Sequence, residues 1–325
     1  GSPPGSRRLR RIDVFNGDAD GLCALRMLRL AEPAEAQLVT GVKRDIALLE
    51  RVAASEGDRV TVLDVSLERN RAALARLLEA GAEVHYFDHH HAGEIPSHPR
   101  LHAAIDPAPG ICTSMLVDRH LAGRYRAWAV AAAFGDGLDE AALELGASIG
   151  LGALELERLR ELGRSLNYNA YGETEADLLI PPAQLYQDLA RYEDPLGFAA
   201  TPICEQLHAN RHADLDAAFE MEPHWSGGEA AVYVLPDAPW SRRVSGTLAN
   251  HLAHVHRKRA VAVLAPRRSG GGFIVSVRVP AAAARGAHEF CRAFGGGGRR
   301  EAAGIDRLAR EKLGEFEQAF AAAYG

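Results

Sequence analysis

The sequence is poor in cysteine and lacks any long apolar run. Its four cysteines (Cys23, Cys112, Cys204 and Cys291) stand far apart, without the paired spacing of a zinc knuckle or a disulfide framework. No apolar stretch reaches the roughly 18 residues of a membrane span, and the opening GSPPGSRRLRR has no apolar signal-peptide core. These absences predict a cytoplasmic protein with reduced thiols and no membrane partner.

Positive charge is scarce as well. The chain has 37 Lys and Arg against 43 Asp and Glu, a formal net charge of -6. No overall positive field would therefore hold a long nucleic acid by neutralising its phosphates, and any nucleic-acid substrate should be short or gripped locally. The 325 residues are 47% hydrophobic and 25% charged, which is typical of a soluble globular protein with room for two domains.

The first third of the sequence alternates strand-like and helix-like segments. Residues 11–15 predict a strand, the NGDADG of 16–21 a tight acidic turn, and 22–31, with apolar residues three and four apart, a helix. Further strands are predicted at 37–42, 59–66 and 83–91, and further helices at 45–55 and 70–81. This alternation is typical of βαβ units in an α/β fold with a mainly parallel sheet.

The rest of the sequence predicts a helical stretch and then a second α/β region. A loop is expected at 92–110, a helix at 111–121 capped by Thr113 or Ser114, and a helix at 126–134 that leads into GDG. Residues 138–222 are mostly helical in pattern, and strands return near Gly228. We therefore predict an α/β domain at 9–190, a helical connector at 191–226 and a smaller α/β domain at 227–325.

Carboxylates stand at the ends of several predicted strands. Asp18, Asp64 and Asp88 each lie at or just past such an end, where parallel sheets collect their ligands. Asp20 shares the turn of Asp18, which Gly17 and Gly21 allow to be sharp, although an ordinary Asp-Gly loop would read the same. Carboxylates gathered at one sheet edge repel one another unless a cation neutralises them, so a metal is expected there.

Histidines follow one of these carboxylates directly. Asp88-His89-His90-His91 comes straight after an apolar strand, and imidazole beside carboxylate is a suitable ligand set for a divalent metal such as manganese. A solvated histidine-rich turn is the alternative. The presence of Asp136 in a second Gly-flanked turn favours the metal.

In this order and at these separations, NGDADG, LDVS, FDHH and FGDG resemble the four motifs of the DHH phosphoesterases. FIVSVRVP and FGGGGRREAAG resemble the substrate-binding strand and glycine motif of the DHHA1 domain that follows in this family. The resemblance extends over nearly the whole chain from Arg11. It implies a DHH catalytic domain at 9–190 and a DHHA1 substrate-binding domain at 227–325, facing each other across a cleft.

The resemblance also implies a set of site residues. It gives two adjacent divalent ions, usually Mn²⁺ with Mg²⁺ as the alternative, bridged by Asp64. Asp18 would bind the first ion, and Asp20, His89 and Asp136 the second. Asp88, His89 and His90 would form the catalytic group, with Asp88 and His90 orienting His89 and contacting the phosphate or the leaving oxygen. The substrate would be bound by Arg278, Gly296, Gly297, Gly298 and Arg299.

Two positions depart from the family pattern. Asn16 stands where relatives carry His or Asp as a ligand of the first ion, and its amide oxygen would bind that ion more weakly. Arg299 stands where relatives usually have His, and a guanidinium keeps or strengthens phosphate binding. The glycine run before it would bring backbone amides close to a phosphate, with a flexible linker as the alternative.

The expected function is that of a metal-dependent phosphodiesterase that hydrolyses short oligonucleotides or dinucleotides with water activated by two metals. The alternatives are a RecJ-like single-strand exonuclease, an exopolyphosphatase or nucleotide phosphatase, and a nucleotide-binding sensor whose first metal site has degenerated at Asn16. The expected partner is a short oligonucleotide, a dinucleotide or another phosphate ester. The oligomeric state stays open, with a homodimer as one option.

Overall fold

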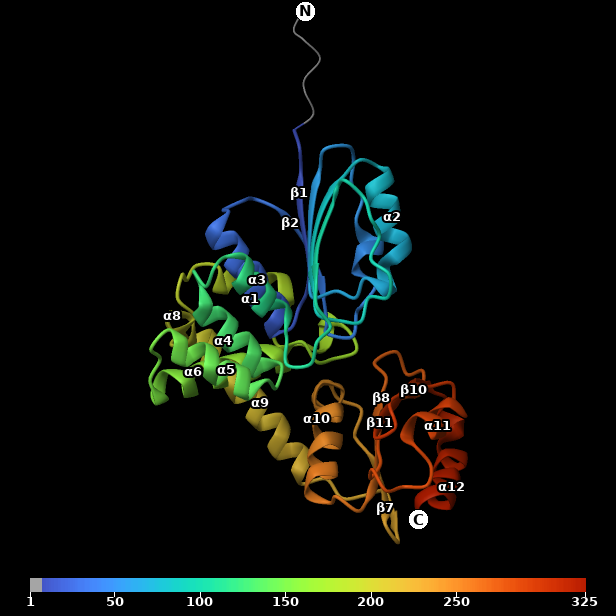
Figure 1. Ribbon diagram of the computed structural model, residues 1–325. Coiled ribbons are helices and arrows are strands. Elements are labelled where there is room, and N and C mark those ends of the chain that lie inside the picture. The colour runs from blue at the N-terminus through green and yellow to red at the C-terminus, as the bar shows by residue number, and fades with distance from the viewer. Residues whose placement is uncertain (1–7) are drawn as a thin grey trace, which may run out of the picture. The chain divides into compact units, whose positions relative to one another are not determined.

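Figure 1 shows the computed structural model, which describes residues 8–325. The chain forms two compact units. The first comprises the described residues up to Ala170 together with Thr174–Ala209, and the second comprises Tyr171–Glu173 and Asn210–Gly325. The division after Ala209 falls inside helix α9 (Pro202–Phe219), so residues 191–226 are shared between the two units.

The first unit is built on a five-stranded parallel sheet with the strand order β2-β1-β3-β4-β5. Its strands are β1 (Arg11–Asn16), β2 (Gln37–Gly41), β3 (Arg59–Leu63), β4 (Glu83–Asp88) and β5 (Leu101–Ile105). In the register, Val14 lies opposite both Val39 and Val62. The predicted α/β fold with a parallel sheet is confirmed, and the carboxyl ends of all these strands meet at one edge.

Helices cover both faces of this sheet (Figure 1). Side chains alternate between the faces along a strand, so Phe15, Leu63 and Phe87 enter one apolar core while Val14 and Val62 enter the other. The first core is covered by α1 (Ala19–Ala31), α3 (Thr113–His120) and α4 (Arg126–Gly135), and the second by α2 (Arg71–Glu79).

Two local predictions differ from the structure. The helix expected at 45–55 is only the short 3₁₀ turn η1 (Leu48–Arg51), since Val52 is already extended and the Asn70 side chain binds the backbone of Ile46 and Leu49. The loop expected at 92–110 contains β5. This edge strand exposes the middle of LHAAI and so lacks the alternation that marks a half-buried strand.

Residues 138–222 are mainly helical, as predicted. The helices are α5 (Asp139–Ser148), α6 (Ala153–Asn169), α7 (Pro182–Leu189), α8 (Pro195–Ala199) and α9. Leu159, Leu162 and Leu185 extend the apolar core around α1 and α4. Within residues 8–325 no helix combines the length and the apolarity that crossing a membrane requires.

The second unit contains a six-stranded sheet of order β10-β11-β9-β8-β7-β6, in which only β7 and β8 pair in parallel. Its strands are β6 (Trp225–Gly227), β7 (Ala230–Val234), β8 (Ala260–Pro266), β9 (Phe273–Arg278), β10 (Gly297–Gly298) and β11 (Ala302–Leu308). Helix α10 (Pro239–Val255) covers one face, and α11 (Ala287–Arg292) and α12 (Leu313–Tyr324) cover the other (Figure 1).

Candidate functional site

The acidic turn after β1 is as sharp as predicted. A Cβ at Gly21 would lie 1.9 Å from the carbonyl oxygen of Asn16, and one at Gly17 would lie 2.2 Å from that of Gly41, so only glycine fits either position. Asp18 is the N-cap of α1, and its Oδ1 accepts a hydrogen bond from the Gly21 amide at 3.0 Å. The turn thereby aims Asp18 and Asp20 at the edge where the strands end.

Asp20 is held by the start of α3. The backbone amides of Ser114 and Thr113 donate to its two carboxylate oxygens at 2.7 and 2.9 Å, and the Ser114 hydroxyl donates to its carbonyl oxygen. The expectation that Thr113 or Ser114 caps α3 is wrong, because the N-cap is Cys112 and makes no side-chain cap bond. The Asp20 carboxylate satisfies the free amides of α3 instead.

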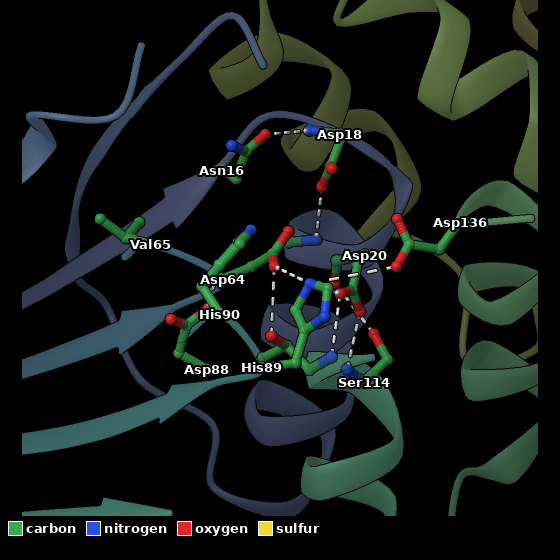
Figure 2. A network of polar contacts seen from close by, with 12 residues as sticks. Asn16, Asp18, Asp20, Asp64, Val65, Asp88, His89, His90, Ser114 and Asp136 are labelled. Atoms are coloured by element: carbon green, nitrogen blue, oxygen red, sulfur yellow. Dashed lines mark hydrogen bonds and ion pairs between the residues drawn. The ribbon is translucent and has the colours of Figure 1, made fainter. Parts of the chain in front are cut away.

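Asp64 leaves β3 in a left-handed conformation, with φ 61°. Aspartate tolerates this region better than most residues, and such conformations concentrate at functional sites. Its Oδ1 accepts from the Thr113 hydroxyl at 3.2 Å and lies 3.1 Å from Nε2 of His89. The same His89 nitrogen is 3.7 Å from Asp20 and 3.9 Å from Asp136, which ends α4 (Figure 2).

These carboxyl groups resist ionising together. Burial, followed by the negative charge of Asp18, raises the pKa of Asp20. Burial, followed by the charges of Asp18 and Asp20, raises the pKa of Asp64 well above its usual value. Burial, Asp20 and Asp18 raise the pKa of Asp136 to about 6. Carboxylate oxygens and an imidazole nitrogen are also the donors that Mn²⁺ takes. The residues therefore fit a divalent cation, which would relieve this repulsion.

Asp88 and His90 form a pair of their own beside this group. Asp88 is fully buried, and its Oδ1 lies 2.7 Å from Nδ1 of His90, a hydrogen bond that raises the pKa of His90. The family resemblance expects Asp88 to orient His89, whereas the contact here is with His90. Because Nδ1 is engaged, Nε2 of His90 is the ring nitrogen left for a substrate.

A cavity of about 360 Å³ opens beside these side chains. It is lined by Asn16, Asp18, Lys43, Asp45, Ile46, Asp64, Val65, Ser66, Arg69, His89, His90 and Asp136. The sequence reading missed two cationic members, Lys43 and Arg69. Lys43 could have been found by the rule that singled out the aspartates, since it stands just past the end of β2.

The residues expected to bind substrate lie at one end of the second sheet. Arg278 ends β9 and donates to Oδ1 of Asn250 at 2.7 Å, and burial and then the nearby Arg299 lower its pKa. A Cβ at Gly296 would lie 2.2 Å from the Gly304 carbonyl oxygen, whereas one at Gly297 would meet nothing within 4 Å. The glycine run is therefore part of the β10–β11 pairing, which excludes the flexible-linker reading.

Gly298 belongs to the same pairing. It lies opposite Ala303 with φ 143°, and a Cβ there would come within 2.6 Å of the Ala303 backbone. The amide of Arg299 donates to the carbonyl oxygen of Ala302 at 2.8 Å, which closes the hairpin. The hairpin thus fixes Arg299 near Arg278.

No protein-family model and no curated protein matches the sequence, but solved structures do match the fold. A structure of exonuclease RecJ bound to manganese matches with a TM-score of 0.65 at 20% identity, over 97% of this chain and 90% of that one. RecJ from Thermus thermophilus with Mn²⁺ matches with a TM-score of 0.57 at 20% identity, over 96% of this chain and 52% of that one. The pGpG-specific phosphodiesterase PggH from Vibrio cholerae matches with a TM-score of 0.58 at 14% identity, over 97% of this chain and 99% of that one.

These matches extend over both units of the chain, so they test the motif reading as a whole. The RecJ and PggH structures are named as an exonuclease and a phosphodiesterase, and the four motifs of this chain lie at the strand and helix ends that build its acidic site. The chain therefore has the RecJ-like DHH fold, and the resemblance to DHH phosphoesterases is confirmed at the level of the fold.

Proposed function

We propose that this chain is a metal-dependent phosphodiesterase that hydrolyses short oligonucleotides or dinucleotides, with Mn²⁺ as the preferred ion and Mg²⁺ as the alternative. The observation that carries the proposal is the convergence of the Asp20, Asp64 and Asp136 carboxylates on Nε2 of His89. Of these four residues, Asp64, His89 and Asp136 line the cavity of about 360 Å³. A cavity of this size is in the range of small-ligand sites and suits one nucleotide at a time.

Asp20, Asp64, His89 and Asp136 would hold the metal. When bound, it lowers the pKa of a water molecule and stabilises charge on the attacking and leaving oxygens. His90 would act on the substrate, because the hydrogen bond with Asp88 raises the pKa of its ring and engages Nδ1, which leaves Nε2 for the substrate. From Nε2 it would donate a proton to the oxygen that leaves phosphorus.

The second unit would supply a separate phosphate subsite. Arg278 and Arg299 are close enough to influence each other electrostatically, and the Asn250 side chain fixes the Arg278 guanidinium. Two guanidinium groups can bind one phosphate with several charge-assisted hydrogen bonds, and Gly297 leaves open space beside them. A phosphate-bearing ligand would gain affinity from these two guanidinium groups, which agrees with a dinucleotide or an oligonucleotide as the substrate class.

The test is product release from a panel of substrates in the presence of Mn²⁺. The panel contains RNA and DNA of two to five nucleotides, a linear and a cyclic dinucleotide, a long single strand and a phosphate monoester. We expect the short diesters to be cleaved fastest. Preferential degradation of the long strand would instead support the RecJ-like exonuclease, and release of phosphate from the monoester alone would support a phosphatase.

Matched variants separate the site from general damage to the fold. Asp64→Asn and His89→Ala should each lose hydrolysis while remaining folded, because each removes a donor from the cation group. The exposed Asp216→Asn in α9 and His254→Ala in α10 make the same chemical changes on solvated helix surfaces and should keep it. Equal losses in the site variants and their controls would contradict the proposed centre.

A nucleotide-binding sensor is the second candidate, and one observation favours it. The Asn16 side-chain oxygen, expected to bind the first ion, accepts the backbone amide of Asp18 at 3.1 Å instead. A sensor would bind a dinucleotide with Mn²⁺ present and leave it intact. Intact recovery of a bound dinucleotide after prolonged incubation would decide for the sensor.

A further inference from the structure

Lys43 brings a positive charge of the chain into the acidic centre. Its Nζ donates to Oδ2 of Asp18 at 3.0 Å and to Oδ1 of Asn167 at 3.1 Å, and it lies 4.0 Å from Oδ1 of Asp136. The backbone around it is fixed on both sides, since its amide donates to Ala170 and its carbonyl oxygen accepts from the Asn16 side chain. The ammonium is thus held in place rather than carried on a loose surface chain.

Asn16 and Asp18, the two residues at the position of the family's first ion, already make hydrogen bonds to other groups of this chain. Asn16 uses its oxygen for the Asp18 amide at 3.1 Å and its nitrogen for the Lys43 carbonyl oxygen at 3.0 Å. Asp18 accepts from the Gly21 amide with Oδ1 and from Lys43 with Oδ2. Relatives carry His or Asp at the position of Asn16, so this chain lacks that ligand of the first ion. The remaining ligand, the Asp18 carboxylate, accepts a hydrogen bond from Lys43.

The residues at the position of the family's second ion are Asp20, Asp64, His89 and Asp136. Asp20, Asp64 and Asp136 lie 3.1 to 3.9 Å from Nε2 of His89, so three carboxylates and one imidazole nitrogen, which suit a divalent ion, gather around one point. Asp18, in contrast, accepts a hydrogen bond from the Lys43 ammonium at 3.0 Å. The chain therefore compensates the charge of Asp18 and leaves the other group to an external cation.

We propose that the Lys43 ammonium replaces the first of the family's two divalent ions, so that the centre holds a single divalent ion bound by Asp20, Asp64, His89 and Asp136. This inference rests on the proposed function. A lysine can grip a phosphate oxygen as a point charge, but it cannot activate water as an ion does. Lys43 would therefore position the substrate phosphate, while the single ion carries the chemistry.

The test counts the Mn²⁺ ions bound by the folded chain. Native mass spectrometry and isothermal titration give the stoichiometry, and electron paramagnetic resonance separates an isolated Mn²⁺ from a spin-coupled pair. Lys43→Met removes the charge at similar length, and combining it with Asn16→Asp restores the missing acidic ligand. Lys43→Arg, which keeps the charge, is the matched control, and circular dichroism verifies that each variant is folded.

We expect one uncoupled ion in the unchanged protein and in Lys43→Arg, and two coupled ions in the double variant. Two coupled ions in the unchanged protein would overturn the role of Lys43 while leaving the phosphodiesterase proposal intact. A single ion in the double variant would also overturn it, because Lys43 would then not be what excludes the second ion. No bound ion and no hydrolysis in the unchanged protein would refute the proposed function itself.

Discussion

Oδ1 of the buried Asp88 lies 2.7 Å from Nδ1 of His90, and this contact raises the pKa of the histidine. A hydrogen bond to one ring nitrogen sets which nitrogen faces the substrate and how readily the ring keeps its proton. In the proposed reaction, Asp88, the last residue of β4, would position His90, and His90 would donate the proton.

Asp88→Asn tests this relationship. An amide cannot hold the imidazolium as a carboxylate does, so we expect kcat to fall by about 10- to 100-fold with KM little changed. The alkaline limb of the kcat–pH profile should move to lower pH, because the pKa of His90 falls without Asp88. A drop in kcat with no shift of the profile would indicate a merely structural role for Asp88.

Asp136→Asn probes the repulsion in the acidic centre. Its folded-state pKa of about 6 lies above the ordinary 3.8, so the folded chain binds more protons than the unfolded chain between these values and loses stability as pH rises through that window. Without metal at pH 7.5, the variant should be more stable than the unchanged protein by on the order of 1–3 kcal/mol. The gain should shrink as the pH falls from 6 toward 3.8 and vanish well below 3.8, where the carboxyl group is protonated in both the folded and the unfolded chain.

The same variant should respond differently to metal. Ions that bind only the folded state raise the melting temperature, so Mn²⁺ should stabilise the unchanged protein more than Asp136→Asn. Thermal denaturation at pH 7.5 with and without Mn²⁺ measures both effects. An unchanged protein that is the more stable of the two even without metal would contradict the repulsion argument.

How far the site could be read from the sequence depends on the kind of contact. Asp18, Asp64 and Asp88 were predictable because parallel strands end at one edge, and the motif order supplied Asp136. The hydrogen bonds from the amides of Thr113 and Ser114 to the Asp20 carboxylate could not be predicted. The Thr113 amide is a backbone donor 93 residues away, and a backbone donor leaves no pattern of side chains in the sequence. β5 was missed because an exposed edge strand has no apolar alternation.

Thr113→Val and Ser114→Ala form a matched pair on α3. The Thr113 hydroxyl donates to Asp64 at 3.2 Å, so its loss should weaken Mn²⁺ binding by about 10-fold or more. The Ser114 hydroxyl reaches only the carbonyl oxygen of Asp20, and its amide survives substitution, so Ser114→Ala should cost about 1 kcal/mol of stability and little metal affinity. Titration calorimetry would show whether the two differ in this order.

His85, in the middle of β4, also makes the stability of the fold depend on pH. Burial, the nearby Arg59 and His102 lower its pKa to about 4 from 6.5, so only the unfolded chain takes up this proton as pH falls below about 6.5. Stability contributed by the neutral ring is complete above that pH and is lost toward pH 4. Urea midpoints should therefore fall less between pH 7 and 5 for His85→Gln than for the unchanged protein.

Gly296→Ala and Gly297→Ala separate the fold of the glycine run from its binding. A methyl group at position 296 would meet the Gly304 carbonyl oxygen at 2.2 Å and should disrupt the pairing of β10 with β11, so we expect a lower melting temperature and loss of binding together. At position 297 a methyl group meets nothing within 4 Å, so stability should be unchanged.

If a phosphate approaches the backbone at Gly297, Gly297→Ala should still weaken the binding of a dinucleotide. This affinity is measured in the Asp64→Asn background, in which we expect no hydrolysis. Unchanged dinucleotide affinity would mean that the phosphate is held by Arg278 and Arg299 alone.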